Sequence, residues 1–236
     1  MAELSTELLN VEQAVKERYA AGAQQAEAAL CCPVEYNPRF LKIIPEEIME
    51  RDYGCGDPSQ HLQPGETVLD LGSGAGKICY IAAQVVGAAG KVIGVDMTPN
   101  MLSLAEKYRH SVGDQLGYHN VEFHRGKIQD LRTDLDAADD YLSQHPVSSV
   151  EDFQTFEASM AEQKTRRPLI ADDSVDAVVS NCVLNLVQDT DKRQLFSEIF
   201  RVLRKGGRAV ISDIIADEPV PTQLKEDPEL WSGCVS

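Results

Sequence analysis

Short apolar runs alternate with longer amphipathic stretches along the chain from Thr67 onward. Five strands are predicted by TVLDL, KVIGVD, NVEFH, VDAVVSN and RAVISDII, which are rich in Val, Ile and Leu. Helices are predicted by GKICYIAAQVVG, ending at Gly87, by PNMLSLAEKYRHSVGDQLG, with Pro99 in its first turn, and by DKRQLFSEIFRVLRKGG, closed by Gly206-Gly207. Strands that alternate with helices indicate a parallel sheet covered on both faces.

The segments around this repeating unit have different patterns. Residues 3–30 carry apolar positions at helical spacing, which predicts one or two N-terminal helices. The loop CCPVEYNP, a short helical stretch in FLKIIPEEIMERD and the turn-rich YGCGDPSQ follow. Residues 130–170, between the third and fourth strands, are polar and mostly acidic with weak helical periodicity. We expect a solvated helical insertion there.

Composition narrows the classes of partner. The chain has 236 residues, 43% of them hydrophobic and 25% charged, as in an ordinary globular protein. A net charge of −16 argues against nucleic acid and anionic membrane surfaces as partners. No apolar run approaches the roughly 18 residues that a membrane span needs, and the acidic N-terminus is unlike a signal peptide. Six cysteines without a C-x-x-C pair indicate mostly free thiols in a reducing cytoplasm.

A glycine-rich turn, Gly72-Ser73-Gly74-Ala75-Gly76, joins the first strand to the next helix. Glycines at such a turn let the backbone approach a ligand closely. A phosphate-binding P-loop is excluded because Leu71 and Ile78 stand where its pattern requires Gly and Ser or Thr. The dinucleotide fingerprint G-x-G-x-x-G also fails, since Lys77 occupies the place of its last glycine.

Two acidic residues accompany this turn. Asp70 precedes the glycines, and Asp96 ends the second strand, 20 residues beyond Gly76 (96 − 76), where it would accept hydrogen bonds from ribose hydroxyls. Together, VLDLGSGAG, VIGVDMT and RVLRKGGR resemble the S-adenosylmethionine (SAM) binding motifs of Rossmann-like methyltransferases. In that resemblance Asp70 holds the cationic methionine end and the GKIQD segment after the third strand holds the adenine. The residues expected to bind SAM are Asp70, Gly72, Ser73, Gly74, Gly76, Asp96, Met97, Ile128, Gln129 and Asn181.

Three cysteines lie in segments that we expect at the carboxyl ends of the strands. Cys182 ends the fourth strand in SNCVLN, Cys55 lies in YGCG ahead of the first strand, and Cys234 lies in WSGC after the fifth. Ligands of open α/β sheets bind at this edge. A thiol is a poor general base but a good ligand for a soft centre such as trivalent arsenic. Such a centre bound by three thiolates keeps a lone pair that can attack a sulfonium methyl group in line.

Six segments together, YGCGDP, DLGSGAG, GVDMTP, VVSNCVLNLV, RVLRKGGRAVISD and DPELWSGC, resemble the SAM-dependent arsenite methyltransferases over most of residues 31–236. The resemblance implies that Cys55, Cys182 and Cys234 hold the metalloid and that Cys31 or Cys32 takes part in a redox relay. It further implies successive methylation of arsenite or its thiol conjugate as a detoxification, with thioredoxin or glutathione resetting the thiols. One departure is Lys77-Ile78-Cys79-Tyr80, where many relatives have Arg-Asp-Cys-Tyr.

The expected fold is therefore a class I, Rossmann-like methyltransferase, with a parallel sheet covered by helices. We expect N-terminal helices and a cysteine-containing cap loop in residues 1–60, the SAM-binding domain in 61–216 and the start of a C-terminal segment in 217–236. A seven-stranded methyltransferase sheet needs two further strands after the fifth, and 217–236 contains Pro219, Pro221 and Pro228 but no strand-like run. The sequence thus predicts an N-terminal portion of a longer enzyme.

Two other functions share parts of this pattern. One is a SAM-dependent methyltransferase for a small carbon or oxygen acceptor, which needs the glycine turn but not the three cysteines. The other is a non-catalytic module that binds SAM or a soft metalloid without turnover. A free cysteine also packs well as a small hydrophobe, and for Cys79, inside an apolar helix, we expect core packing.

Overall fold

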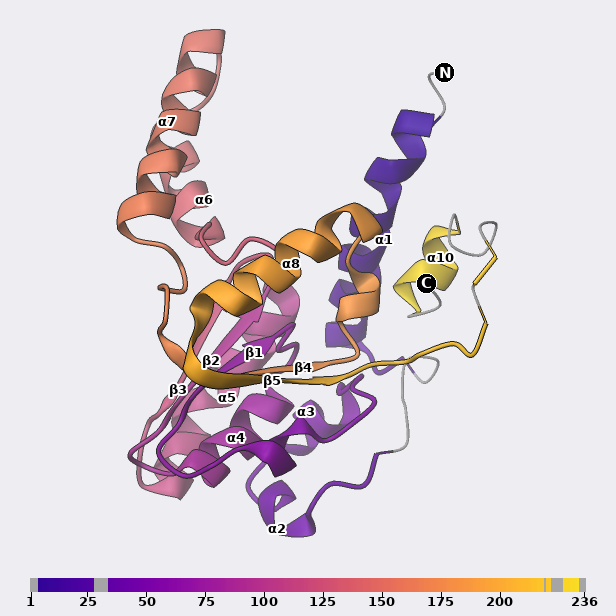
Figure 1. The fold of residues 1–236 in the computed structure, drawn as a ribbon, viewed down its shortest axis with the longest axis vertical. Coiled ribbons are helices and arrows are strands. Elements are labelled where there is room, and N and C mark those ends of the chain that lie inside the picture. The colour runs from indigo at the N-terminus through magenta and orange to yellow at the C-terminus, as the bar shows by residue number, and fades with distance from the viewer. Residues whose placement is uncertain (1–3, 28–33, 219, 222–226, 234–236) are drawn as a thin grey trace.

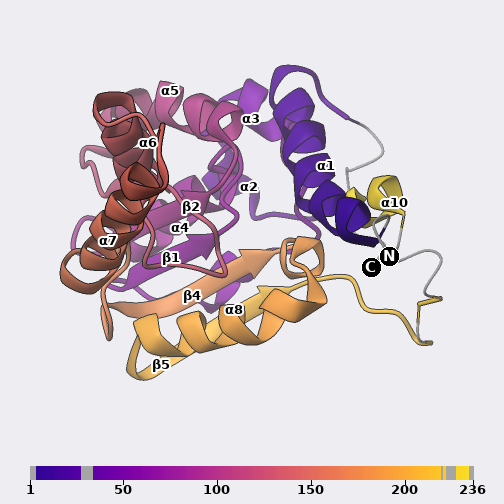
Figure 2. The ribbon, with the colours of Figure 1, turned by 90° about the horizontal axis from the view of Figure 1, so that it is seen from above.

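The computed structural model describes residues 4–27, 34–218, 220–221 and 227–233, and these form a five-stranded parallel sheet with helices on both faces (Figures 1 and 2). The strand order is β3-β2-β1-β4-β5, and every neighbouring pair is parallel. The strands are β1 (Thr67–Leu71), β2 (Lys91–Asp96), β3 (Val121–Arg125), β4 (Val175–Asn181) and β5 (Leu203–Ser212). This confirms the predicted parallel α/β fold.

Helices cover the sheet because its strands are apolar on both sides. Val68 of β1 packs into one hydrophobic cluster together with Ile81, whereas its neighbour Leu69 packs into the opposite cluster with Leu195. The first face carries α4 (Lys77–Val86) and α5 (Pro99–Leu116), and α8 (Asp189–Val202) lies on the second (Figure 1). Side chains that alternate between two buried faces explain the continuous apolar runs in the sequence.

Two further helices lie together at one end of the sheet (Figure 2). They are α1 (Leu4–Gln24) and α10 (Pro228–Ser232), and Arg18 of α1 donates to the Glu229 carbonyl at 2.9 Å. Trp231 of α10 donates through Nε1 to the carbonyl of Leu186 at 3.1 Å, in the short 3-10 helix η3 (Leu184–Leu186) that follows β4. This end of the molecule therefore joins the first and last described helices to the carboxyl edge of the sheet.

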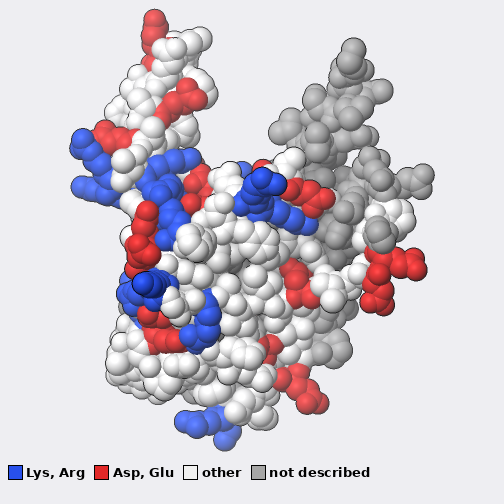
Figure 3. All heavy atoms as spheres, in the orientation of Figure 1, with Lys and Arg blue, Asp and Glu red and all other residues white. Residues whose placement is uncertain are grey.

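The acidic insertion forms a hairpin of two helices, α6 (Leu135–Gln144) and α7 (Val150–Arg166), which projects from the body (Figure 1). No residue of α7 is buried, and a Ser149–Asp152 capping box begins the helix. Lysines and arginines gather near its base (Figure 3). They pair with acidic groups there, as Lys164 does with Asp130 at 2.8 Å. The insertion is helical and solvated, as the sequence predicted.

Two sequence predictions of element boundaries are wrong. The helix expected to end at Gly206-Gly207 ends at Val202, and β5 begins at once with Leu203 in an extended conformation. Register explains the difference: Val175 pairs with Leu203 but Ala177 pairs with Arg208, so residues 204–207 form a bulge in the strand. Gly206 provides the left-handed turn of this bulge, with φ +86°.

The second difference concerns the short helical stretch before the first strand. It divides into α2 (Pro38–Leu41) and α3 (Glu46–Glu50), because Pro45 lacks the N–H that would continue the first helix. A 3-10 turn, η2 (Pro58–His61), then leads into the sheet. None of the helices in the described part of the chain combines the length and apolar character needed to cross a bilayer.

Candidate active site

A cleft opens at the carboxyl ends of β1, β2 and β4, with a volume of about 1110 Å³ including its solvent-open mouth. This is the edge where ligands of open parallel sheets bind. Nine of the ten residues predicted to bind SAM line it: Asp70, Gly72, Ser73, Gly74, Asp96, Met97, Ile128, Gln129 and Asn181.

Gly76 is the exception among these ten residues. It lies outside the cleft and begins α4 with φ +85°. A Cβ atom at this position would stand 2.7 Å from the Phe123 ring and 3.1 Å from Ala105. The glycine is therefore required by the packing of α4 against β3 and α5, and its contact with the cofactor stays a prediction.

The glycine turn brings its backbone to the cleft in left-handed conformations that favour glycine, with φ +70° at Gly72 and +51° at Gly74. A Cβ atom at Gly72 would lie 2.5 Å from Val183, beyond the end of β4. The Gly74 N–H donates to Asp96 Oδ2 at 2.9 Å, and the Thr98 N–H donates to Asp96 Oδ1 at 2.8 Å. Asp96 thus orients the turn, and burial raises the pKa of its carboxyl group.

Asp70 is buried at the base of the cleft, and burial raises its pKa to about 7. The Cys79 thiol donates to Asp70 Oδ2 at 3.2 Å, which partly offsets this effect. No cationic side chain among the described residues pairs with Asp70. The Ser73 hydroxyl beside it is buried without a hydrogen-bond partner in the same part of the chain. A carboxyl group and a hydroxyl that both lack strong partners fit a polar, cationic ligand such as the methionine end of SAM.

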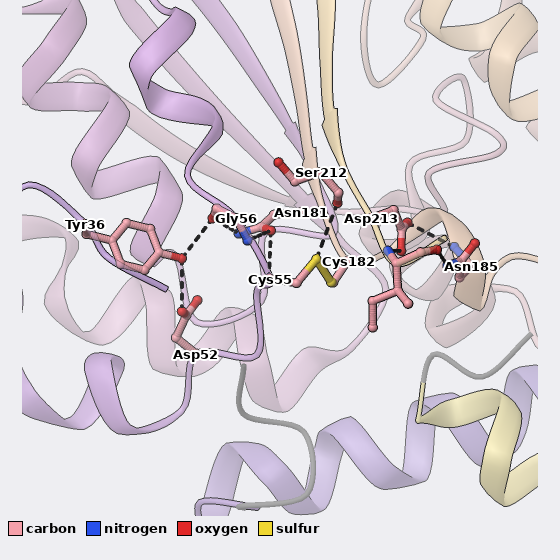
Figure 4. Close-up of a disulfide and its surroundings, with 10 residues drawn as sticks. Tyr36, Asp52, Cys55, Gly56, Asn181, Cys182, Asn185, Ser212 and Asp213 are labelled. Atoms are coloured by element: carbon pink, nitrogen blue, oxygen red, sulfur yellow. Dashed lines mark hydrogen bonds between the residues drawn. A yellow bond between two sulfur atoms is a disulfide. The ribbon is translucent and has the colours of Figure 1, made fainter. Parts of the chain in front are cut away.

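On the other side of the cleft, Cys55 and Cys182 form a disulfide with a Cα–Cα distance of 5.7 Å (Figure 4). The two cysteines are 127 positions apart in sequence, and the fold brings them together as predicted. The expectation of mostly free thiols is wrong for these two, and among the described cysteines only Cys79 is free and buried. Cys31, Cys32 and Cys234 lie outside the described residues.

The loop that carries Cys55 is fixed to β4 by Asn181 (Figure 4). Asn181 Oδ1 accepts hydrogen bonds from the backbone N–H groups of Cys55 and Gly56, each at 2.9 Å. Its Nδ2 group donates to the Gly56 carbonyl at 2.8 Å. Asn181 is predicted to contact the cofactor, and no local pattern in the sequence indicates these contacts with a loop more than 120 residues away.

Lys77 lies where the sequence departs from the family pattern that it resembles, and the structure provides a local role for the lysine. Lys77 Nζ is 2.7 Å from Asp52 Oδ2 and 3.7 Å from the centre of the Tyr36 ring. Burial raises the pKa of Asp52, and the Lys77 ammonium group opposes that shift. The buried ion pair connects the start of α4 to the segment just before Cys55, a contact that local sequence patterns do not predict.

Helix α1 also contributes to the cleft, through Glu12, Val15 and Tyr19. Glu12 pairs with Lys127 of the predicted adenine segment at 2.5 Å. Val15 packs with Trp231 in a small cluster that Met97 and Leu186 border. The sequence predicted this helix but not its position, since an amphipathic pattern does not specify which surface the apolar side covers.

Comparison with known proteins identifies the family. A family model described as a methyltransferase domain matches residues 62–165 and 148–236. The chain belongs to the methyltransferase domain family. The fold agrees with this assignment, because the cleft lies at the edge of a parallel sheet beside a glycine turn and two acidic residues.

Individual relatives are more specific than the family model. The chain is 35% identical over 209 residues to an arsenite methyltransferase from Aquipseudomonas alcaligenes, covering 87% of this chain and 50% of that one. An arsenite methyltransferase from Halobacterium salinarum is 40% identical over 185 residues, covering 78% and 36%. The crystal structure of an arsenic(III) S-adenosylmethionine methyltransferase from Chlamydomonas reinhardtii matches with a TM-score of 0.62 and 32% identity, covering 86% and 57%. The chain thus spans about half the length of these relatives.

Proposed function

We propose that this chain takes part in methyl transfer from SAM to trivalent arsenic held by cysteine thiolates, giving methylated arsenicals. The observation that carries the proposal is the proximity of Cys55 and Cys182 beside a cleft that bears the features of a SAM site. The similarity to arsenite methyltransferases over more than three quarters of the chain supports the same acceptor.

The cofactor side of the proposal assigns roles to residues of the cleft. Asp70 pairs with the ammonium group of the methionine end, the backbone of residues 72–74 lies against the same part, and Asp96 accepts from the ribose. Ile128 and Gln129 border the adenine, and Met97 contributes apolar surface. SAM supplies an electrophilic methyl group on a sulfonium sulfur.

The acceptor side needs reduced thiols. Two thiols of a reductant open the Cys55–Cys182 disulfide by exchange, leaving two protein thiols and one oxidised reductant disulfide. Both thiolates then coordinate arsenic(III), and we propose Cys234 as the third ligand. Three sulfur ligands leave the arsenic lone pair available to form an As–C bond as the S–CH3 bond of SAM breaks and S-adenosylhomocysteine leaves. Arsenic is thereby oxidised from As(III) to As(V), and two thiols of the reductant return it to As(III) as they form a disulfide. The protein mainly orients the acceptor and excludes water.

Further parts of the proposal concern the surroundings of the reaction. Cys31 or Cys32 acts as the additional redox cysteine, and thioredoxin or glutathione is the reductant. A cytoplasmic location follows from this proposal, because these reductants keep thiols reduced there. The boundaries expected from sequence, at residues 60 and 216, are also proposed here as those of the SAM-binding domain.

The reaction is tested with the reduced chain, arsenite, methyl-labelled SAM and glutathione, with chromatographic separation of the arsenic species. We expect labelled methylarsenicals, and loss of three thiols per arsenite bound when thiols are titrated without SAM. Cys182→Ser should abolish the product and bind arsenite weakly. Val150→Ser, at a position on α7 that is 73% exposed, serves as the matched surface control. Thiol loss without labelled product from a chain that binds SAM would refute methyl transfer and leave metalloid binding.

A further inference from the structure

Cys182 adopts a backbone conformation that is uncommon for a residue with a side chain. Its φ is +57°, in the left-handed region. Neighbouring side chains on a strand normally point to opposite faces of the sheet. Because β4 ends at Asn181 and the chain turns left-handed at Cys182, both side chains reach the same loop, Tyr53–Gly56. Asn181 contacts the backbone of this loop, and Cys182 is bonded to the sulfur of Cys55 in the same loop.

The Asn181 amide makes three hydrogen bonds with that loop. Its oxygen accepts from two N–H groups, and its nitrogen donates to the Gly56 carbonyl. A Cβ atom on Gly54 would stand 2.1 Å from Asn181 Nδ2, so the loop lies directly on the amide. Asn181 is 9% exposed, and its hydrogen bonds are therefore formed in a largely dry environment. Its polar atoms are directed to the Cys55 loop, although its surface borders the cleft.

We propose that Asn181 is a positioning residue that holds the Cys55 thiol beside the Cys182 thiol, so that the pair is organised for a soft acceptor. The inference deepens the proposed function and rests on it for the identity of the acceptor. It assigns Asn181 to the thiol pair, whereas the sequence placed it with the cofactor.

The geometry gives the expected size of the effect. Without the amide, the loop keeps other connections: the Tyr53 hydroxyl donates to the Gly22 carbonyl at 2.9 Å, the Tyr36 hydroxyl donates to the Gly56 carbonyl at 3.1 Å, and Cys55 Sγ is 3.7 Å from the Ser212 carbonyl. The loop should therefore remain near β4 but sample more positions. Two thiols held less closely have a lower effective concentration toward each other. Loss of three hydrogen bonds, offset partly by water, corresponds to a change of about tenfold or more.

The test uses the full chain with Cys31, Cys32 and Cys234 replaced by serine, which leaves Cys55, Cys182 and the buried Cys79. The protein is equilibrated in glutathione redox buffers, where the disulfide and two glutathione molecules exchange with two protein thiols and one oxidised glutathione. The fraction of Cys55–Cys182 disulfide is counted by alkylation and mass spectrometry. Arsenite affinity is measured by calorimetry on the reduced chain that retains Cys234, the proposed third ligand, and SAM affinity is measured on the same chain.

Asn181→Ala should make the disulfide about tenfold easier to reduce, a shift of about 30 mV, and should weaken arsenite binding by a similar factor. SAM affinity should fall by a smaller factor than arsenite affinity, because the three hydrogen bonds of the Asn181 amide go to the Cys55 loop. Asn181→Asp keeps the acceptor for both N–H groups but loses the donor to Gly56, and its effect should be intermediate. Asn120→Ala is the matched control: Asn120 fixes another loop through the Gly87 carbonyl at 2.9 Å, at the amino ends of the strands.

Each alternative result decides against the proposal. An unchanged disulfide equilibrium in folded Asn181→Ala would overturn it, as would a loss of SAM affinity equal to the loss of arsenite affinity. Equal effects from Asn120→Ala would show that the change is a general loss of stability. If Asn181→Ala does not fold, an Asn181→Asp variant whose disulfide equilibrium equals that of the parent would also overturn the proposal. The disulfide measurement requires no arsenic, so failure of this inference is distinguishable from failure of the proposed function.

Discussion

At the scale of single residues, the cofactor side of the cleft depends on a carboxyl group with an unusual environment. Asp70 is enclosed by the sheet and receives a hydrogen bond from a thiol, a weak donor. Asp96 and Asp52 add negative charge nearby, and both increase the pKa of Asp70 beyond the effect of burial. The Asp70 carboxyl group therefore gains a proton near neutral pH, and a bound cation would favour its ionised form.

The affinity for SAM should therefore depend on pH. The pKa of Asp70 is raised to about 7, so the carboxyl group is protonated and neutral below that pH and cannot pair with an ammonium group. As the pH falls from 7.5 to 5.5, the Kd for SAM should increase by at most about tenfold per pH unit, because Asp70 must lose one proton before it can bind SAM. Calorimetry across this range measures it. Asp70→Asn should bind more weakly with a flat profile, and a flat profile in the parent would contradict the prediction.

Residue identities in the site were predictable only where the pattern is local. Asp70 is the next-to-last residue of β1 and Asp96 is the last residue of β2, beside a glycine turn, so their positions follow from strand direction alone. The Lys77–Asp52 pair and the Asn181 contacts join segments 25 and more than 120 residues apart, and no spacing in the sequence specifies them. The disulfide was missed for another reason, because cysteine count and composition favoured free thiols.

At the scale of elements, the turn between β1 and α4 separates two uses of glycine. Gly72 and Gly74 present backbone to the cleft, whereas Gly76 lets the start of α4 pack against Phe123. All three have positive φ. The sequence motif therefore combines a ligand requirement with a packing requirement.

Gly76→Ala should destabilise the fold more than an alanine at another left-handed glycine. Gly117, which ends α5 with φ +80°, has open space around its missing Cβ, so alanine there introduces only the backbone cost of about 1 kcal/mol. Gly76→Ala adds a clash with the Phe123 ring, and its total cost should be about 2 to 4 kcal/mol. Urea denaturation of both variants measures the two free energies of unfolding. Equal free energies of unfolding for the two variants would mean that the Phe123 ring moves aside without an energetic cost.

Helices and strands were predicted well where the period of the hydrophobic residues and the residues typical of helix ends indicated the same boundaries. All five strands appear, and α4 and α5 end where Gly87 and Gly117 turn left-handed. The boundary between α8 and β5 was misplaced because Gly206-Gly207 resembles a helix C-cap, and only pairing with β4 shows that it is a strand bulge. Tertiary pairing decided what the local signal left ambiguous.

At the scale of the whole molecule, the disulfide links two distant parts of the chain. Cys55 precedes β1 and Cys182 follows β4, so the closed loop includes the first four strands with α4 and α5. A crosslink over 127 positions restricts the unfolded chain strongly.

Oxidised protein should consequently be more stable than reduced protein. The chain-entropy relation gives roughly 5 kcal/mol for a loop of this length, an upper value if the unfolded chain retains structure. Thermal denaturation with and without a phosphine reductant should show a higher Tm for the oxidised form. Cys182→Ser should unfold near the reduced parent and respond little to the reductant. A parent whose Tm does not depend on the reductant would contradict this account.

Trp231 is the only tryptophan in the chain, and its ring is enclosed between α1 and η3, against Val15 and Leu186. Nearly all indole fluorescence of the protein therefore originates from the single junction where the first and last described helices meet above the cleft. The protein contains its own optical probe there, and any ligand or reductant that loosens this junction exposes the indole to water and shifts its emission to the red without an added label.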